Sequence, residues 1–256
     1  MQIRTDQLLK ISNKMDKIKT ALVTGANKGI GLATVRGLAK LGYKVWLGSR
    51  DKIRGQRAID QLQSEGLVVE LLLLDVSDDS SVQAAVDAVS AQTPQLDLLI
   101  NNAGVALDLN VSPANESLAS IRAMYEVNLF GPIRVTQAFL PLLKAAEEAR
   151  IVILSSIVGS LTLSSDPSVI YGQVNFMGYS SSKAALNMVT VALAKELGPL
   201  GIKVYAVEPG HIQTDLNNNT GTLSTDEGAA VPLRYATMKL DVPNGGFFGP
   251  EGILPW

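Results

Sequence analysis

Short apolar runs alternate with amphipathic segments along most of the chain, and the fold can be predicted from this alternation. Short β-rich runs, most of them mainly apolar, predict buried strands at residues 20–24, 44–47, 67–74 (broken only by Glu70), 96–100, 151–154 and 202–207, with a short last strand at 246–248. Helical spacing of apolar positions predicts helices at residues 30–41, 52–65, about 78–91 and 182–197, and another after residue 128. Ser77 and Asp78 offer N-caps to the third of these helices. Strands that are apolar on both faces and alternate with helices are typical of a parallel sheet covered on both sides. We therefore predict an α/β fold, a doubly wound parallel sheet with helices on both faces.

The domain organisation is simple. Residues 1–16 are polar and weakly patterned, so we expect a flexible N-terminal extension. We expect one domain over residues 17–256, because no repeat, low-complexity tract or long linker divides it. The polar segment 217–226 (NNNTGTLSTD) has no pattern and predicts a mobile loop.

Composition and charge exclude several kinds of function. The 22 basic and 24 acidic residues give a net charge of −2, which lacks the basic excess that nucleic-acid binding needs. Cysteine is absent and His211 is the only histidine, which excludes disulfides, thiolate metal sites and a multi-histidine metal site. No apolar run approaches the roughly 18 residues of a membrane helix, and the N-terminus lacks a secretory signal. We expect a cytoplasmic protein with no metal, nucleic-acid or membrane partner.

A glycine-rich turn joins the first strand to the first helix. It reads TGANKGIG over residues 24–31, with the glycines spaced G-x-x-x-G-x-G. Glycines let the backbone approach a pyrophosphate, which binds at the positive N-terminus of the following helix. A turn without a ligand is the alternative, and the position between strand and helix argues against it. The cofactor-binding residues expected here are Gly25, Asn27, Lys28, Gly29, Ile30 and Gly31.

The end of the second strand predicts which dinucleotide binds. An acid that holds the ribose 2′-hydroxyl is expected about 20 residues after the glycines, but Ser49 stands there and Arg50 follows. A guanidinium at this place binds a 2′-phosphate, and Lys28 adds a second cation. Asp51 falls where the next helix needs an N-cap. We therefore predict NADP(H) as the preferred cofactor, with NAD(H) as the alternative if Arg50 and Lys28 are only surface charges.

These residues, together with Gly55-Gln56, resemble the short-chain dehydrogenase/reductase family, and within it the carbonyl reductases. The match runs from about residue 19 to about residue 249. The resemblance implies a Rossmann fold and further cofactor contacts in three segments. After the third strand, Asp75 and Val76 would contact the adenine. After the fourth strand, Asn102, Ala103 and Gly104 belong to the NNAG motif. Pro209, Gly210, Ile212 and Thr214 lie in the segment that would close over the nicotinamide.

The same resemblance implies the catalytic residues. Tyr179 and Lys183 form a Y-x-x-x-K pair on one helix face, with Tyr179 as proton donor and Lys183 also on the nicotinamide ribose. A nearby ammonium and a positive nicotinamide ring are expected to lower the pKa of the phenol. Ser156 is preferred over Ser155 for the hydrogen bond to the substrate oxygen. Asn128 would kink a helix and position a water that links Lys183 to solvent.

Two other residues compete for catalytic roles. Tyr171 lies in the stretch before Tyr179 that exceeds the family's usual spacing, and this stretch is expected to build part of the substrate-pocket rim. Tyr171 has Asn175 rather than a lysine at i+4, so it is a poor proton donor. For His211 we favour a cleft-lining or backbone-bonded role over that of a general base.

The function predicted from these residues is NADPH-dependent hydride transfer between nicotinamide and a carbonyl or alcohol substrate: a ketone, an aldehyde or a quinone. The alternatives are an NAD-dependent alcohol dehydrogenase or ketoacyl-thioester reductase of the same family, and a non-catalytic dinucleotide-binding regulator. The rim segments carry no arginine cluster, which favours a small or medium apolar carbonyl compound. The helices after Asn128 and Tyr179 are apolar nearly all round, so we expect a homodimer or homotetramer.

Overall fold

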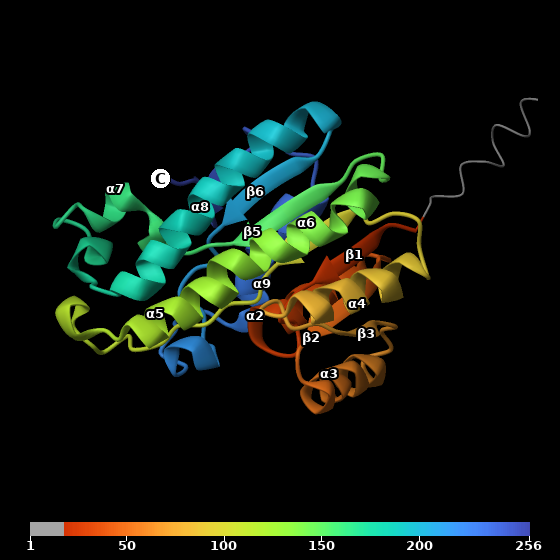
Figure 1. The fold of residues 1–256 in the computed structure, drawn as a ribbon, viewed down its shortest axis with the longest axis horizontal. Coiled ribbons are helices and arrows are strands. Elements are labelled where there is room, and N and C mark those ends of the chain that lie inside the picture. Colours follow the sequence, from red (N-terminus) through yellow and green to blue (C-terminus); the bar gives the residue numbers. More distant parts are fainter. Residues whose placement is uncertain (1–17) are drawn as a thin grey trace, which may run out of the picture.

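Eight strands form one sheet in the computed structural model, which describes residues 18–256 (Figure 1). The order across the sheet is β3-β2-β1-β4-β5-β6-β7-β8; the strands pair in parallel except for the antiparallel β7–β8 pair. The strands are β1 (Thr20–Val23), β2 (Lys44–Ser49), β3 (Glu70–Leu73), β4 (Leu98–Asn101), β5 (Arg150–Leu154), β6 (Lys203–Val207), β7 (Phe247–Gly249) and β8 (Gly252–Ile253). The prediction of a doubly wound parallel sheet is confirmed. The predicted extension over residues 1–16 lies outside the described residues.

Helices cover both faces of the sheet. One face packs against α4 (Asp79–Ser90), α6 (Gly131–Lys144) and α8 (Met177–Leu197), and their apolar residues form one core. The other face packs against α2 (Gly29–Lys40), α3 (Lys52–Ser64) and α9 (Thr225–Thr237), which form a second core. The sheet separates these two cores, which is why its strands carry apolar side chains on both faces. None of the helices within residues 18–256 is long and apolar enough to cross a membrane.

Two side-chain caps explain where helices begin. The Asp51 carboxylate accepts the backbone N–H of Arg54 at the start of α3, and Asp78 accepts those of Ser80 and Ser81 at the start of α4. An N-cap acceptor satisfies N–H groups that have no partner inside the helix. Both predicted caps are confirmed.

The structure differs from the predicted elements in several places. The helix α8 begins at Met177 rather than at residue 182, and β3 is shorter than the apolar run 67–74. The segment 217–226 is not one loop, because α9 already begins at Thr225. Ser224 and Glu227 form a reciprocal capping box that starts this helix.

Two of the helical segments that the alternation did not predict lie at one end of the molecule. They are α5 (Leu118–Tyr125) and α7 (Leu161–Ser164), which Figure 1 shows near the N-terminal end of α8. Segments that follow the carboxyl ends of β1 to β6 carry most of the predicted site residues. Because parallel strands end at the same edge of a sheet, these segments can form one cleft.

Candidate active site

The glycine turn after β1 is shaped by close backbone approaches. Gly25 and Gly29 both adopt φ of +60°, which side chains rarely tolerate. A Cβ on Gly31 would lie 2.4 Å from Nδ2 of Asn102. That amide donates to the carbonyls of Thr24 (2.8 Å) and Gly25 (3.0 Å). The predicted residue Asn102 therefore fixes the shape of the turn through its side chain.

The turn leads into a helix start without a side-chain cap. Lys28 occupies the N-cap position of α2, and no side chain bonds the first N–H groups of the helix. Uncapped N–H groups at the positive end of a helix suit a phosphate. The glycine turn and this helix start therefore fit the pyrophosphate of a dinucleotide, which Gly25, Asn27, Gly29, Ile30 and Gly31 would hold.

At the end of β2, contacts among the described residues hold the Asp51 carboxylate but not the Arg50 guanidinium. The Asp51 carboxylate caps α3 and also pairs with Nε of Arg54 at 3.0 Å. Arg50 is exposed, and within residues 18–256 its side chain has no ion pair or hydrogen bond. Lys28 is not free in the same way, because its ammonium lies 2.5 Å from the Asp215 carboxylate. In the part of the chain that the structure describes, Arg50 is therefore a cation without a protein partner at the end of β2.

The predicted adenine segment is an ordered turn after β3. Oδ1 of Asp75 accepts hydrogen bonds from the backbone N–H (3.0 Å) and the hydroxyl (2.6 Å) of Ser77. The side chain of Val76 is buried. Asp78 caps α4, so Asp75 is not the N-cap of that helix. Helix capping, a common reason for an acid after a strand, therefore does not explain Asp75.

Tyr179 and Lys183 lie in the first turns of α8, next to the end of β5. The Lys183 ammonium is buried, donates to the Leu154 carbonyl at 2.8 Å and lies 5.8 Å from the centre of the Tyr179 ring. Ser156 lies near the Tyr179 hydroxyl and lowers its pKa. Ser155 instead points its hydroxyl at Oδ1 of Asn187, 2.5 Å away. Ser156 is therefore the serine near Tyr179, while Ser155 is bonded to Asn187.

Burial shifts the pKa of both members of the pair. Desolvation raises the pKa of Tyr179 to about 12, with the Ser156 hydrogen bond opposing this and the Glu208 carboxylate adding to it. Desolvation lowers the pKa of Lys183 to about 8. The expected lowering of the phenol pKa by Lys183 is not found; that ammonium donates to the Leu154 carbonyl. Tyr179 is therefore a neutral phenol at neutral pH, the form that can donate a proton.

The lowered pKa of Lys183 predicts a pH dependence of reduction. The ammonium is present below its pKa of about 8 and is lost as the pH rises through that value. We expect kcat/KM for carbonyl reduction to be level at lower pH and to decline above pH 8. Stopped-flow or steady-state rates between pH 6 and 10, about two pH units either side of this pKa, would measure the decline. A profile that stays level to pH 10 would contradict the role of this ammonium.

Asn128 lies in a π-helical turn (Glu126–Phe130) between α5 and α6. Its side chain is fully buried; Oδ1 accepts from the Val105 N–H at 2.8 Å, and Nδ2 donates to the Val105 carbonyl at 2.9 Å. Nδ2 also lies 3.1 Å from the Ser182 hydroxyl. A Cβ on Gly104 would lie 3.4 Å from Oδ1 of Asn128 and 3.7 Å from Nζ of Lys183. Asn128, Gly104 and Lys183 are therefore neighbours, as the motif order suggested.

The segment after β6 reaches back to the glycine turn. A Cβ on Gly29 would lie 3.7 Å from Cγ2 of Thr214, so the Thr214 side chain lies against the glycine turn. Gly210 has φ of +99° after Pro209. Ile212 is buried, and its side chain packs against Gly228 of α9, which leaves its backbone for any cofactor contact. His211 is exposed, which agrees with the preference against a general base.

Sequence reasoning missed two polar residues at this edge, Glu208 and Asn187. Glu208 is buried; Oε1 accepts the Gly210 N–H at 2.9 Å, and desolvation raises the pKa of its carboxyl. Asn187 links Ser155 to the Gly159 carbonyl. Asn187 is one turn beyond Lys183 on the same helix face, a spacing that could have indicated it. No cluster of candidate metal ligands occurs among residues 18–256.

The fold and the site are those of a nicotinamide-dinucleotide-dependent oxidoreductase. Residues 19–223 match the family model described as short chain dehydrogenase. The chain is 35% identical to a (+)-neomenthol dehydrogenase of Arabidopsis thaliana, over 91% of this chain and 96% of that protein. The chain therefore belongs to the short-chain dehydrogenase/reductase family.

Carbonyl reductases are among the relatives in both sequence and structure. Carbonyl reductase [NADPH] 1 of Mus musculus is 31% identical over 92% of this chain and 98% of that protein. The crystal structure of NADPH-bound carbonyl reductase from chicken fatty liver superimposes with a TM-score of 0.82 at 30% identity, covering 94% of this chain and all of that one.

Proposed function

We propose that the protein reduces a ketone, aldehyde or quinone with NADPH, and that Tyr179 donates the proton to the substrate oxygen. The observation that carries this proposal is the placement of the Tyr179 ring 5.8 Å from the buried Lys183 ammonium, with Ser156 near the phenol hydroxyl. A bound reduced nicotinamide would supply the hydride. Ser156 would hold the substrate oxygen beside the phenol, so that the proton arrives where negative charge develops.

Lys183 and Asn128 would restore the proton. The Lys183 ammonium lies over the Tyr179 ring, and Asn128 is a neighbour of that ammonium through Gly104. We propose that Lys183 also hydrogen-bonds the nicotinamide ribose and that Asn128 holds a water leading to solvent. Lys183 and Asn128 are both buried, so this proton path would be shielded from bulk water except where the water held by Asn128 leads to solvent.

The preference for NADPH rests on Arg50. Its guanidinium is exposed and unpaired in the described chain, while Asp51, the nearby acid, is held by α3 and Arg54. An acid fixed in this way is not free to hold a ribose 2′-hydroxyl, and a guanidinium is well matched to a phosphate. The NADPH-bound carbonyl reductase among the structural relatives supports the same choice.

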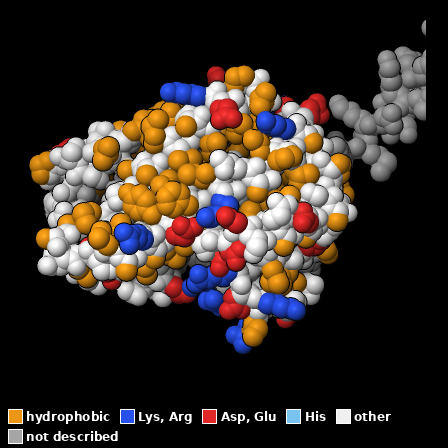
Figure 2. All heavy atoms as spheres, viewed as in Figure 1, with side chains coloured by type: hydrophobic (Ala, Val, Ile, Leu, Met, Phe, Trp, Pro, Cys, Tyr) orange, Lys and Arg blue, Asp and Glu red, His pale blue; other side chains and the backbone are white. Residues whose placement is uncertain are grey.

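The substrate class follows from the apolar character of the surrounding segments. Exposed apolar side chains lie on the rim segments, in the loop before α5, at the start of α5, in the α7 region and at the start of α8: Leu107, Leu118, Leu161, Ile170 and Met177. Figure 2 shows apolar side chains among polar ones at this end of the molecule. We propose a small or medium apolar carbonyl compound. The assignment to the cytoplasm stays a prediction from the sequence.

A panel of carbonyl compounds tests this function. Ketones, aldehydes and quinones would be offered with NADPH or NADH, and the loss of reduced-nicotinamide absorbance followed. We expect turnover of apolar carbonyls, faster with NADPH. Binding of NADPH without turnover of any carbonyl would instead support the alternative of a non-catalytic dinucleotide-binding regulator.

We also propose that the protein forms a dimer through the outer faces of α6 and α8. Figure 2 shows a broad apolar area over these helices, to which the exposed Phe130 and Met188 contribute. We expect light scattering at micromolar concentration to give at least twice the chain mass. The variant Met188→Lys should shift the species to a monomer by placing charge in the interface. A wild-type monomer would contradict this proposal.

A further inference from the structure

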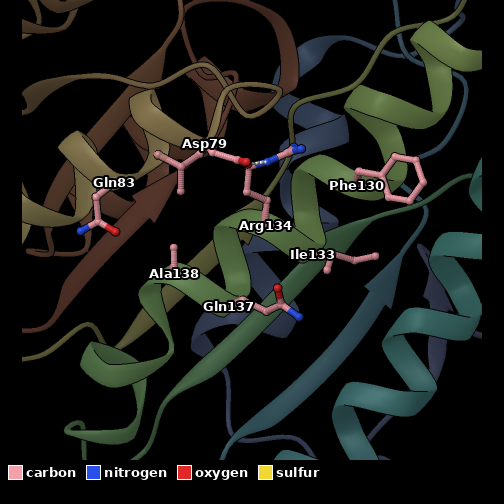
Figure 3. Close-up of a pocket in the computed structure, with 8 residues that line it drawn as sticks. Asp79, Gln83, Phe130, Ile133, Arg134, Gln137 and Ala138 are labelled. Carbon is pink, nitrogen blue, oxygen red and sulfur yellow. Dashed lines mark hydrogen bonds and ion pairs between the residues drawn. The ribbon is translucent and has the colours of Figure 1, made fainter.

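One arginine that the sequence analysis did not single out joins two parts of the site. Arg134 lies near the start of α6, and its guanidinium donates from Nη1 to the Val76 carbonyl at 2.7 Å and from Nη2 to Oε1 of Glu126 at 2.8 Å. Its Nε also pairs with the Asp79 carboxylate. Figure 3 shows this pair bridging from α6 to the start of α4. The guanidinium thus contacts the adenine segment, the π-helical turn and α4 together.

The contacts around Arg134 are tight on the side of the adenine segment. A Cβ on Gly131, the first residue of α6, would lie 2.8 Å from Cγ2 of Val76. The beginning of α6 therefore rests directly on Val76, and the guanidinium holds the carbonyl of that same residue. The Arg134 side chain is 23% exposed, at a groove of about 540 Å³ between α4 and α6.

The other partners of Arg134 explain why the geometry needs a guanidinium. Glu126 is the first residue of the π-helical turn that carries Asn128, and Asp79 is the first residue of α4. A planar guanidinium offers donors in fixed directions and can serve a carbonyl and two carboxylates at once. An ammonium is a point charge on a flexible stem and does not reproduce this fork.

We propose that Arg134 is a positioning residue for the adenine half of the cofactor, because it fixes the Asp75–Val76 segment against the π-helical turn. The proposal rests on the proposed dinucleotide function. It predicts that losing the guanidinium weakens binding of the adenine half and leaves the chemistry at the nicotinamide end largely unchanged.

The test uses Arg134→Met and Arg134→Lys, with Arg36→Met as a matched control. Arg36 has similar exposure (18%) and pairs with two acids, Glu65 and Asp226, away from the adenine segment. Calorimetry would measure binding of adenosine 2′,5′-bisphosphate to the protein without cofactor, and steady-state kinetics would give KM for NADPH and kcat. We expect both the dissociation constant and KM to rise about tenfold in Arg134→Met, with a smaller rise in Arg134→Lys. The value of kcat at saturating NADPH should stay within about twofold for both.

The outcomes separate this proposal from the proposed function. Wild-type affinity for the bisphosphate in both Arg134 variants would overturn the positioning role while leaving the reductase intact. An equal weakening in Arg36→Met would also overturn it, because the effect would then be general. A wild-type protein that binds NADPH but reduces no carbonyl would refute the function, whereas the calorimetric comparison would still test Arg134.

Discussion

Replacing Tyr179 with phenylalanine is expected to lower kcat for carbonyl reduction by about 10²–10⁴-fold, because the reaction loses its proton donor. The substitution removes only the phenol hydroxyl and keeps the aromatic ring beside Lys183. The fold and the affinity for NADPH should therefore remain near those of the wild type. Steady-state rates at saturating NADPH, with a thermal melt and a binding titration, would measure this.

Two further variants control for the loss of a phenol hydroxyl. Tyr43→Phe removes a hydroxyl at the start of β2, remote from the catalytic helix, and should keep wild-type kcat. Tyr171→Phe tests the competing tyrosine, which lies in a short 3₁₀ helix (Ile170–Gln173) of the rim. Full activity in Tyr179→Phe, together with a large loss in Tyr171→Phe, would reassign the proton donor.

The second large effect concerns cofactor choice. Arg50→Asp should reduce the ratio of kcat/KM for NADPH to that for NADH by about 10²-fold. The change would remove the proposed charge-assisted hydrogen bond, worth about 1.5–3 kcal/mol, and the new carboxylate would repel the 2′-phosphate. Each tenfold change corresponds to about 1.4 kcal/mol, so a hundredfold shift lies within this range.

Charge reversal alone must be distinguished from loss of this contact. Arg57→Asp makes the same change on an exposed position of α3, outside the proposed phosphate site. It should leave the NADPH to NADH ratio unchanged. An unchanged ratio in Arg50→Asp as well would remove the assigned role of Arg50 and reopen NAD(H) as the cofactor.

Much of the fold could be predicted because the strands are buried on both faces and the caps are local. The apolar runs located β1, β2, β4, β5 and β6 to within a few residues, and Asp51 and Asp78 marked the starts of α3 and α4. The polar sequence from residue 217 hid the start of α9, although Ser224 and Glu227 have the spacing of a capping box. The short β8 pairs only with β7, across a sharp turn that the pattern does not show.

The site residues divide in the same way. The family resemblance predicted Ser156, Tyr179, Lys183 and Asn128 as a catalytic set, and the structure places Tyr179 and Lys183 together at the end of β5. The pKa of Tyr179 could not be predicted, because it depends on burial and on Glu208, which comes from another strand end. Arg134 was missed for a similar reason: Val76, one of its partners, is 58 positions away in sequence.

The most direct test of the account is a hydride-transfer experiment with NADPH that carries deuterium on the reactive face of its nicotinamide. A ketone or aldehyde consumed in the panel would be reduced by the wild-type protein, and the alcohol analysed by mass spectrometry and NMR. The account predicts an alcohol with one deuterium on the former carbonyl carbon and its hydroxyl proton from solvent. Alcohol without deuterium at that carbon, or no alcohol from any carbonyl although NADPH binds, would contradict it.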